Sequence, residues 1–191
     1  MKTKKYIAFL CILALSMTLF AGCTQKADTP ATETKAKDSL IVVMKADVRS
    51  FDPIFGNDVA GHQVYDQIYE TLLKFDDDGN MVPGLAESVT QPDDVSYEIK
   101  LKKGIKFHNG EEMKANDVKF TLYRIASQPC DIHYLFKDVN AESFETPDEY
   151  TVRFKINKPN SAFMSYLAFS TVGVVNRSEE RRVGKECRSR W

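Results

Sequence analysis

An acidic stretch that starts at residue 76 comes nearest to a metal-binding pattern in this sequence. Asp76, Asp78 and Asn80 alternate with other residues, and Glu87 follows eleven residues after the first of them. Oxygen ligands occur in this order in calcium-binding loops, but such a loop needs Gly at its sixth position for a sharp turn. Met81 stands there. We therefore expect a hairpin turn with solvated acids and no metal site.

The cysteines and histidines do not form a metal-binding pattern either. Cys130 and His133 are a single Cys-x-x-His pair without another ligand pair nearby, whereas structural metal sites need about four ligands. His108 lies in a Phe-His-Asn-Gly stretch and is expected to be a turn residue, and His62 is expected to be exposed near the start of a helix. The sequence predicts no metal and no cofactor.

Sequence signatures of catalysis are missing too. The chain has no glycine-rich phosphate loop, so any coupled ATP hydrolysis would belong to another subunit. No local sequence motif assembles a nucleophile with an orienting histidine and an acid. Because the members of a triad can be dispersed along a chain, a hydrolase stays open as the alternative to a protein that only binds.

The charge of the chain is unevenly distributed. Among 191 residues, 26 Lys and Arg oppose 27 Asp and Glu, for a net charge of −1. Residues 1–22 carry three lysines and no acid, and residues 177–191 carry six basic and three acidic residues, so that residues 23–176 hold a charge of −7. An acidic body repels a phosphate backbone, and we exclude nucleic acid as a partner.

The amino-terminal residues have the features of an export signal. Three lysines precede an uncharged run of 15 residues, 6–20, which is shorter than the roughly 20 residues of a spanning helix. Leu19-Phe20-Ala21-Gly22-Cys23 then resembles the lipobox of bacterial lipoproteins, although Phe20 is an unusual residue there. The resemblance implies a signal peptide over 1–22 and lipidation of Cys23. An ordinary secretory signal followed by a chance cysteine is the alternative.

A polar segment follows the signal. Residues 24–38 contain no aromatic residue, Leu, Ile or Val, so they cannot bury enough surface to offset the entropy of ordering. We expect 23–38 to be a flexible tether between a lipid anchor and a folded domain.

The folded part has no disulfide available. Apart from Cys23, Cys11 lies in the signal and Cys187 near the end, which leaves Cys130 without a disulfide partner.

The remaining sequence alternates between strand and helix patterns. A continuous apolar run at Ser39–Met44 predicts a buried strand, and alternating apolar residues predict strands over 95–101 and 150–156. Apolar residues at helical spacing predict helices over 59–73 and 116–127, and a short helix that contains Phe163. The fold class is mixed α/β.

Five blocks of this region occur in a recognisable order: Ser50–Pro53, Ile68–Leu73, Pro83–Ser88, Leu101–Gly110 and Ala115–Thr121. Their succession over residues 40–176 resembles the family 5 extracellular solute-binding proteins, which are peptide and nickel receptors of ABC importers. Two departures, Thr71 in place of Gly and Val89 in place of Trp, affect local packing only.

The resemblance implies an α/β, periplasmic-binding-protein-like type II clamp whose lobes close on a ligand by hinge motion. It assigns 39–69 to the start of lobe I, 70–168 to the small lobe II and 169–176 to the return into lobe I. Because members of the family are more than twice as long, we expect the clamp formed by 39–176 to be incomplete.

The implied function is capture without catalysis. A receptor of this family would bind a peptide or related solute, a nickel chelate included, outside the membrane. It would then deliver the ligand to ABC permease and ATPase subunits. With the lipid on Cys23 it would sit at the extracytoplasmic face of the cell membrane, in the periplasm or at the cell exterior. A lipid-anchored exported hydrolase is the alternative function.

Two stretches are the candidate ligand contacts. Asn57, Asp58 and Val59 resemble the family segment whose backbone runs beside a bound peptide and adds to it as a strand would. Tyr134 corresponds to a position where the family can place an aromatic residue at the cleft. In both stretches a loop residue that only solvates its own turn is the alternative.

The last residues differ from everything before them. Residues 177–191 show no apolar periodicity, and in all 15 codons they can be back-translated into a string that resembles a common short-read sequencing adapter. We expect this segment to be translated adapter; a basic nucleic-acid or membrane tail is the alternative. Long-read resequencing decides: a receptor frame that continues after Asn176 supports this origin, and an authentic stop after Trp191 refutes it.

Overall fold

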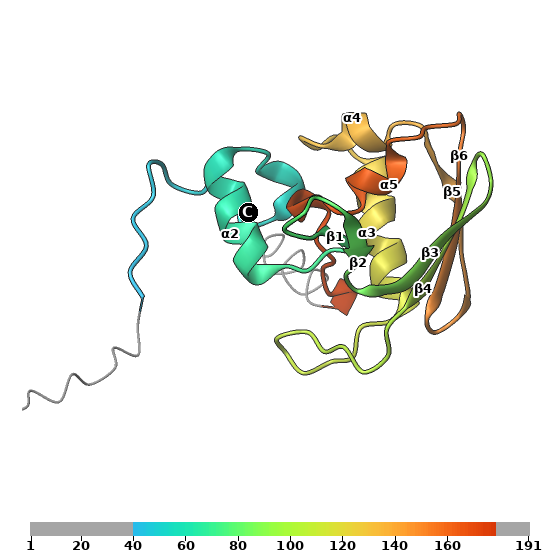
Figure 1. Cartoon of the computed structure of the whole chain (residues 1–191), viewed down its shortest axis with the longest axis horizontal. Coiled ribbons are helices and arrows are strands. Elements are labelled where there is room, and N and C mark those ends of the chain that lie inside the picture. The colour runs from blue at the N-terminus through green and yellow to red at the C-terminus, as the bar shows by residue number, and fades with distance from the viewer. Residues whose placement is uncertain (1–39, 179–191) are drawn as a thin grey trace, which may run out of the picture. The chain divides into compact units, whose positions relative to one another are not determined.

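Residues 40–178 are described by a computed structural model, and the signal peptide, Cys23, the tether and most of the 177–191 segment lie outside them. The chain divides into two units between Val42 and Val43, and the described helices and strands belong to the second. Among residues 40–178, no helix has the length and apolar character needed to cross a bilayer. In chain order the elements are η2 (Pro53–Phe55), α2 (Val59–Ile68), β1 (Leu73–Phe75), β2 (Met81–Pro83), β3 (Ala86–Asp93), β4 (Ser96–Leu101), α3 (Ala115–Ser127), α4 (His133–Phe136), β5 (Val139–Asp148), β6 (Thr151–Ile156), α5 (Phe163–Tyr166) and η3 (Ser170–Val172) (Figure 1).

An antiparallel sheet with the strand order β3-β4-β6-β5 forms one part of this unit (Figure 1). Its middle strands pair so that Tyr97 lies opposite Phe154, and both side chains are buried. The neighbouring pair, Glu98 and Arg153, points to the other face because side chains alternate along a strand. There Arg153 Nε donates to Glu98 Oε2 at 2.7 Å. One face of the sheet is therefore apolar and the other polar.

Helix α3 packs against β5 and β6 of this sheet (Figure 1). Val118, Leu122 and Ile125 recur at helical spacing and are all buried. The backbone N–H of Lys114, the residue before the helix, donates to the Asp117 carboxylate at 2.9 Å, which caps the helix N-terminus.

The short helix α5 adds an aromatic residue to the same core. Phe163 is 1% exposed, and its ring centroid lies 4.9 Å from that of Tyr97, 5.4 Å from Phe136 and 5.7 Å from Phe154. Tilted and edge-to-face arrangements at these distances are favourable for aromatic rings. The cluster joins α5, α4 and the middle of the sheet.

Helix α2 packs with η2 and η3. The Asp58 carboxylate caps α2 by accepting the Gly61 N–H at 2.8 Å. Gly61 is required there, because an added Cβ would lie 2.4 Å from the Gly56 carbonyl oxygen. Further along α2, Tyr65 Oη donates to the Ser50 carbonyl at 2.6 Å. The segment before α2 is thus fastened to the helix at two points.

The acidic stretch between β1 and β2 is a hairpin turn, as the sequence predicted. Asp76 Oδ1 accepts backbone N–H groups from Asn80 at 2.7 Å and from Asp78 at 3.1 Å. Gly79 adopts the left-handed conformation, with φ of 81°. These hydrogen bonds, led by that from Asn80, lower the pKa of Asp76. The carboxylate is therefore engaged within its own turn.

The sequence prediction of the core elements is confirmed, but two strands of the four-stranded sheet were missed, and the short strands β1 and β2 were predicted only as the surroundings of a turn. β4, β6, α3 and α5 match the predicted segments. β3 and β5 are outer strands of the sheet with mostly exposed or half-exposed residues, and both have register shifts against their neighbours. Such irregular edges interrupt the alternation by which a strand is recognised.

Two predicted elements are wrong in part. The helix expected over 59–73 ends at Ile68, because Tyr69 is extended and Leu73 begins β1. The strand expected over Ser39–Met44 is not formed in its described part, and Leu40 and Val43 are 88% and 90% exposed. No strand among residues 40–178 pairs with this run, and an extended segment gains stability only from paired neighbours.

Candidate functional site

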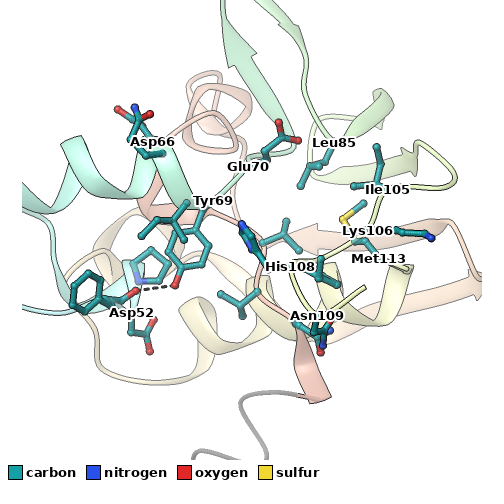
Figure 2. Close-up of a pocket in the computed structure, with 18 of the residues that line it drawn as sticks. Asp52, Asp66, Tyr69, Glu70, Leu85, Ile105, Lys106, His108, Asn109 and Met113 are labelled. Atoms are coloured by element: carbon teal, nitrogen blue, oxygen red, sulfur yellow. Dashed lines mark hydrogen bonds between the residues drawn. The ribbon is translucent and has the colours of Figure 1, made fainter. Parts of the chain in front are cut away.

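A cavity of about 900 Å³ lies between the end of α2, the loop before α3 and the segment after η3 (Figure 2). Its wall includes the apolar residues Ile68, Leu85, Ile105, Met113 and Val174. Figure 2 shows the labelled charged residues Asp66 and Lys106 extending outward from opposite sides. The cavity therefore offers apolar surface with polar groups at its margin, which suits binding by burial.

One end of this cavity is tied to the segment before η2. Tyr69 Oη donates to the Phe51 carbonyl at 2.8 Å, the dashed line in Figure 2. Burial raises the pKa of Tyr69, and the nearby Asp52 adds to this effect. Asp52 in turn forms an ion pair with Arg124 of α3. The tyrosine is therefore a neutral hydrogen-bond donor at neutral pH, and it holds the segment at the cavity edge.

The opposite side of the cavity is the loop that contains His108. The loop is closed by a bridge between Lys106 and Glu112. The Glu112 carboxylate accepts the Gly104 N–H at 2.8 Å and the Tyr150 hydroxyl at 2.9 Å, and these bonds lower its pKa. His108 lies in a turn closed by the hydrogen bond from the Gly110 N–H to the Phe107 carbonyl at 2.9 Å, as the sequence predicted. It is exposed and lines the cavity, which the sequence did not indicate.

The candidate ligand residues lie outside that cavity. Asn57 and Val59 are exposed, the latter by 76%, on either side of Asp58. Asp58 is the N-cap of α2, so its carboxylate has a structural partner in Gly61. The turn-solvating role named as an alternative therefore applies to Asp58. Of its two exposed neighbours, Asn57 has its side-chain Oδ1 3.1 Å from His62 Nε2.

Tyr134 lies in α4 with 60% of its surface exposed. Tyr134 and Asn57 are far apart in sequence, but the loop before α4 contacts the Asn57 segment through Asp131. The Asp131 carboxylate accepts the Asn57 N–H at 3.5 Å, and the Asp131 N–H donates to the Ile54 carbonyl at 3.0 Å. Arg49 forms an ion pair with the same carboxylate. The fold thus brings the two candidate stretches together.

His62 occupies a position that the sequence did not foresee. It was expected to be exposed, but it is half-buried between Asn57 and Ser170. Its Nε2 lies 3.1 Å from Asn57 Oδ1, and its Nδ1 lies 2.8 Å from Ser170 Oγ. No spacing in the sequence signals these contacts, because Asn57 lies before α2 and Ser170 comes from a distant part of the chain.

No metal centre emerges within residues 40–178, where no three His, Cys, Asp or Glu side chains could hold an ion together. Cys130 is a free, half-buried thiol whose pKa is raised by burial. The His133 Nδ1 lies 2.9 Å from the Ile125 carbonyl oxygen, so this ring is engaged with backbone. Both residues of the Cys-x-x-His pair therefore lie in structural environments and not in a metal site.

This mixed α/β arrangement, with an apolar cavity and polar groups at its margin, is suited to binding a ligand by burial. Residues 80–186 match the family described as "Bacterial extracellular solute-binding proteins, family 5 Middle". The chain belongs to this family, as the five sequence blocks predicted. Family 5 proteins bind solutes for transport and are not enzymes, and the hydrolase alternative is not carried further.

Proteins whose names or structures include a ligand are similar to this chain in sequence or in fold. The chain is 31% identical over 181 residues to the glutathione-binding protein GsiB of Escherichia coli K12, an alignment that covers 93% of this chain. It superposes on the oligopeptide-binding protein AppA of Bacillus subtilis, solved with a nonapeptide, with a TM-score of 0.62, 28% identity and 70% of this chain covered. For NikZ of Campylobacter jejuni, solved with Ni(L-His), these values are 0.64, 25% and 75%.

The chain spans only part of each relative. It covers 33% of GsiB, 26% of AppA and 28% of NikZ. The predicted fold class, part of a family 5 clamp, is therefore confirmed for the described residues. The lobe boundaries and the four candidate ligand residues stay predictions.

Proposed function

We propose that this chain is the amino-terminal part of the solute-binding component of an ABC importer, and that it takes part in capturing a peptide or a related small solute. One observation supports the proposal: the Asp131 carboxylate, in the loop before Tyr134, accepts the Asn57 N–H, so that the loop leading to one exposed candidate stretch contacts the other. Glutathione and a nonapeptide, the ligands named for two relatives, favour a peptide. A nickel chelate is the second candidate because NikZ was solved with Ni(L-His).

NMR titration of the ¹⁵N-labelled chain tests the binding. The probes are glutathione, trialanine and Ni(II)-histidine. Because one lobe offers only part of the contacts of a closed clamp, we expect dissociation constants on the order of 1 mM. A peptide should shift the amide signals of Asn57, Val59 and Tyr134 and be recovered intact. Shifts confined to other residues, or a cleaved peptide, would contradict the proposal.

A matched pair of tyrosine variants sharpens this titration. Tyr134→Ala should weaken peptide binding, because it removes an exposed ring from the proposed surface. Tyr123→Ala, which removes an exposed tyrosine of α3 outside both candidate stretches, should leave the affinity unchanged. Both rings are 46% exposed or more, so neither change should alter the melting temperature appreciably. Equal effects of the two variants would argue against a role of Tyr134.

We further propose that the protein works at the extracytoplasmic face of the cell membrane, held by lipid on Cys23 and partnered by permease and ATPase subunits. The lipobox-like residues 19–23 support this placement. More than one acyl chain would give stable anchoring. The exported protein should partition into detergent and carry acyl mass on Cys23, whereas Cys23→Ala should not. A wild-type product in the aqueous phase with an unmodified cysteine would refute the anchor.

A further inference from the structure

A chain of two hydrogen bonds fixes the side chain of Asn57. The imidazole of His62 lies between Asn57 Oδ1, 3.1 Å from Nε2, and Ser170 Oγ, 2.8 Å from Nδ1. The three residues come from the loop before α2, from α2 itself and from η3. His62 therefore links the candidate ligand segment to η3, whose Ser170 is 108 residues from His62 in sequence.

The chemistry of the three groups sets the direction of both bonds. An amide oxygen can only accept a hydrogen bond, so the Nε2 of His62 must carry the proton that it donates to Asn57. A neutral imidazole then has an acceptor at Nδ1. Ser170 supplies the matching donor, because a hydroxyl can rotate its hydrogen toward that nitrogen. The chain runs from Ser170 through His62 to Asn57.

This direction decides which face of the Asn57 amide is left for a ligand. The oxygen is occupied by His62, whereas the Nδ2 amide has no hydrogen-bond partner within residues 40–178, and the residue is exposed. The backbone is held as well, since the Asn57 N–H donates to Asp131 and Asp58 caps α2. A donor whose orientation is fixed in advance loses little entropy on binding.

We propose that Asn57 is a specificity-determining residue that presents its amide N–H to an oxygen acceptor of the ligand, a peptide carbonyl or a carboxylate, and that His62 and Ser170 are its positioning residues. This inference rests on the proposed function, because it assumes that the Asn57 surface contacts the ligand. It deepens that function by naming the complementary group: an oxygen acceptor pairs here, and a ligand ammonium does not.

The first test needs no ligand. Long-range ¹H–¹⁵N correlation spectra at pH 8, where imidazole is ordinarily neutral, report which ring nitrogen carries the proton. We expect the Nε2–H tautomer for His62. An Nδ1–H tautomer would overturn the inference, because the amide of Asn57 would then have to turn its nitrogen toward the ring and its oxygen outward.

The second test uses substitutions and trialanine as the probe. Asn57→Asp places an oxygen where the amide N–H stood, and it should weaken binding about tenfold or more. Asn157→Asp, the same change at an exposed site outside both candidate stretches, should not. His62→Ala should also weaken binding, whereas His62→Gln, whose side-chain amide can donate to Asn57, should restore most of it. A purely structural role would make the two His62 variants follow their melting temperatures instead.

The outcomes separate the two proposals. If the wild-type chain binds none of the probes, the proposed function fails, and the ligand role of Asn57 fails with it, even where the tautomer is as expected. If the wild type binds and Asn57→Asp binds equally well, the proposed function stands and this inference is refuted.

Discussion

The Asp52 carboxylate and the Arg124 guanidinium form an ion pair that joins η2 to α3, 72 residues apart in sequence. The Arg124 side chain is only 10% exposed, and that of Asp52 is 33% exposed. Asp52 also caps η2 by accepting the Ile54 N–H at 3.4 Å. The candidate ligand segment follows directly after η2, so this pair fixes where the segment starts relative to the sheet and its helix.

Loss of this pair should destabilise the protein more than loss of an exposed pair. Arg124→Gln leaves a half-buried carboxylate without its cation, and we expect a cost of about 2 kcal/mol in the free energy of unfolding. Arg153→Gln breaks the pair with Glu98 on the polar face of the sheet, where Arg153 is 52% exposed, and should cost less than about 1 kcal/mol. Urea unfolding of both variants gives the comparison. Equal costs would mean that burial adds nothing to the Asp52 pair.

The aromatic cluster around Phe163 should be the most sensitive part of the core. Phe163→Ala removes a ring that is 1% exposed and contacts Tyr97, Phe136 and Phe154. We expect a loss of about 3–5 kcal/mol. Phe75→Ala, at a position that is 48% exposed, serves as the control and should cost less than about 1 kcal/mol. Thermal and urea unfolding measure both. A small effect at Phe163 would show that α5 does not hold the sheet.

Turn carboxylates should make stability depend on pH in the acid range. Asp93 accepts the backbone N–H groups of Val95 at 2.9 Å and Ser96 at 2.7 Å, and the bond from Val95 is the main cause of its lowered pKa. The unfolded chain binds this proton at the ordinary pKa of 3.8, the folded chain only at lower pH. The contribution is therefore complete above about pH 4 and is lost as pH falls through the folded-state pKa.

The measurement is unfolding of wild type and Asp93→Asn between pH 7 and pH 2.5. The wild type should be the more stable at pH 7, and the difference should shrink below about pH 4. Asp94→Asn is the control, because the Asp94 carboxylate accepts no hydrogen bond within residues 40–178. A difference that persists at pH 2.5 would show that the carboxylate charge is not what Asp93 contributes.

The sequence predicted the elements whose pattern is set by one buried face. In β4 and β6 the apolar residues alternate because α3 and the aromatic cluster cover only one side of the sheet. In α3 the spacing of Val118, Leu122 and Ile125 follows from the same contact. β5 escaped prediction because its register shifts, between Asn140 and Asp148, break the alternation locally. Such irregularities depend on the neighbouring strand and leave little trace in the sequence.

The candidate site was only partly accessible to sequence reasoning. The stretches around Asn57 and Tyr134 were predicted as ligand contacts from the resemblance. The contact of Asp131 with the Asn57 segment, in contrast, is a tertiary contact across 74 residues. The same holds for His62, whose partner Ser170 is set by the packing of η3 on α2. The residue type determines which hydrogen bonds a side chain can donate or accept, whereas the fold determines which partner it contacts.

The apolar run at residues 40–43 should drive association between chains. Leu40, Ile41, Val42 and Val43 are 69–90% exposed and carry no charge. Short uncharged segments rich in β-branched residues pair readily with copies of themselves when no strand of their own chain covers them. At concentrations of about 100 μM we expect the wild-type chain to form oligomers, detectable by light scattering after size exclusion.

Substitution of Ile41 and Val43 by lysine should abolish this association, because charges on an extended segment oppose pairing. The melting temperature should stay unchanged, since both side chains are exposed, by 87% and 90%. The matched variant replaces the same two residues with threonine, which keeps β-branching and adds no charge. It should still associate more than the lysine variant. A wild-type chain that stays monomeric at this concentration, or lysine and threonine variants that behave alike, would show that residues 40–43 do not mediate contacts between chains.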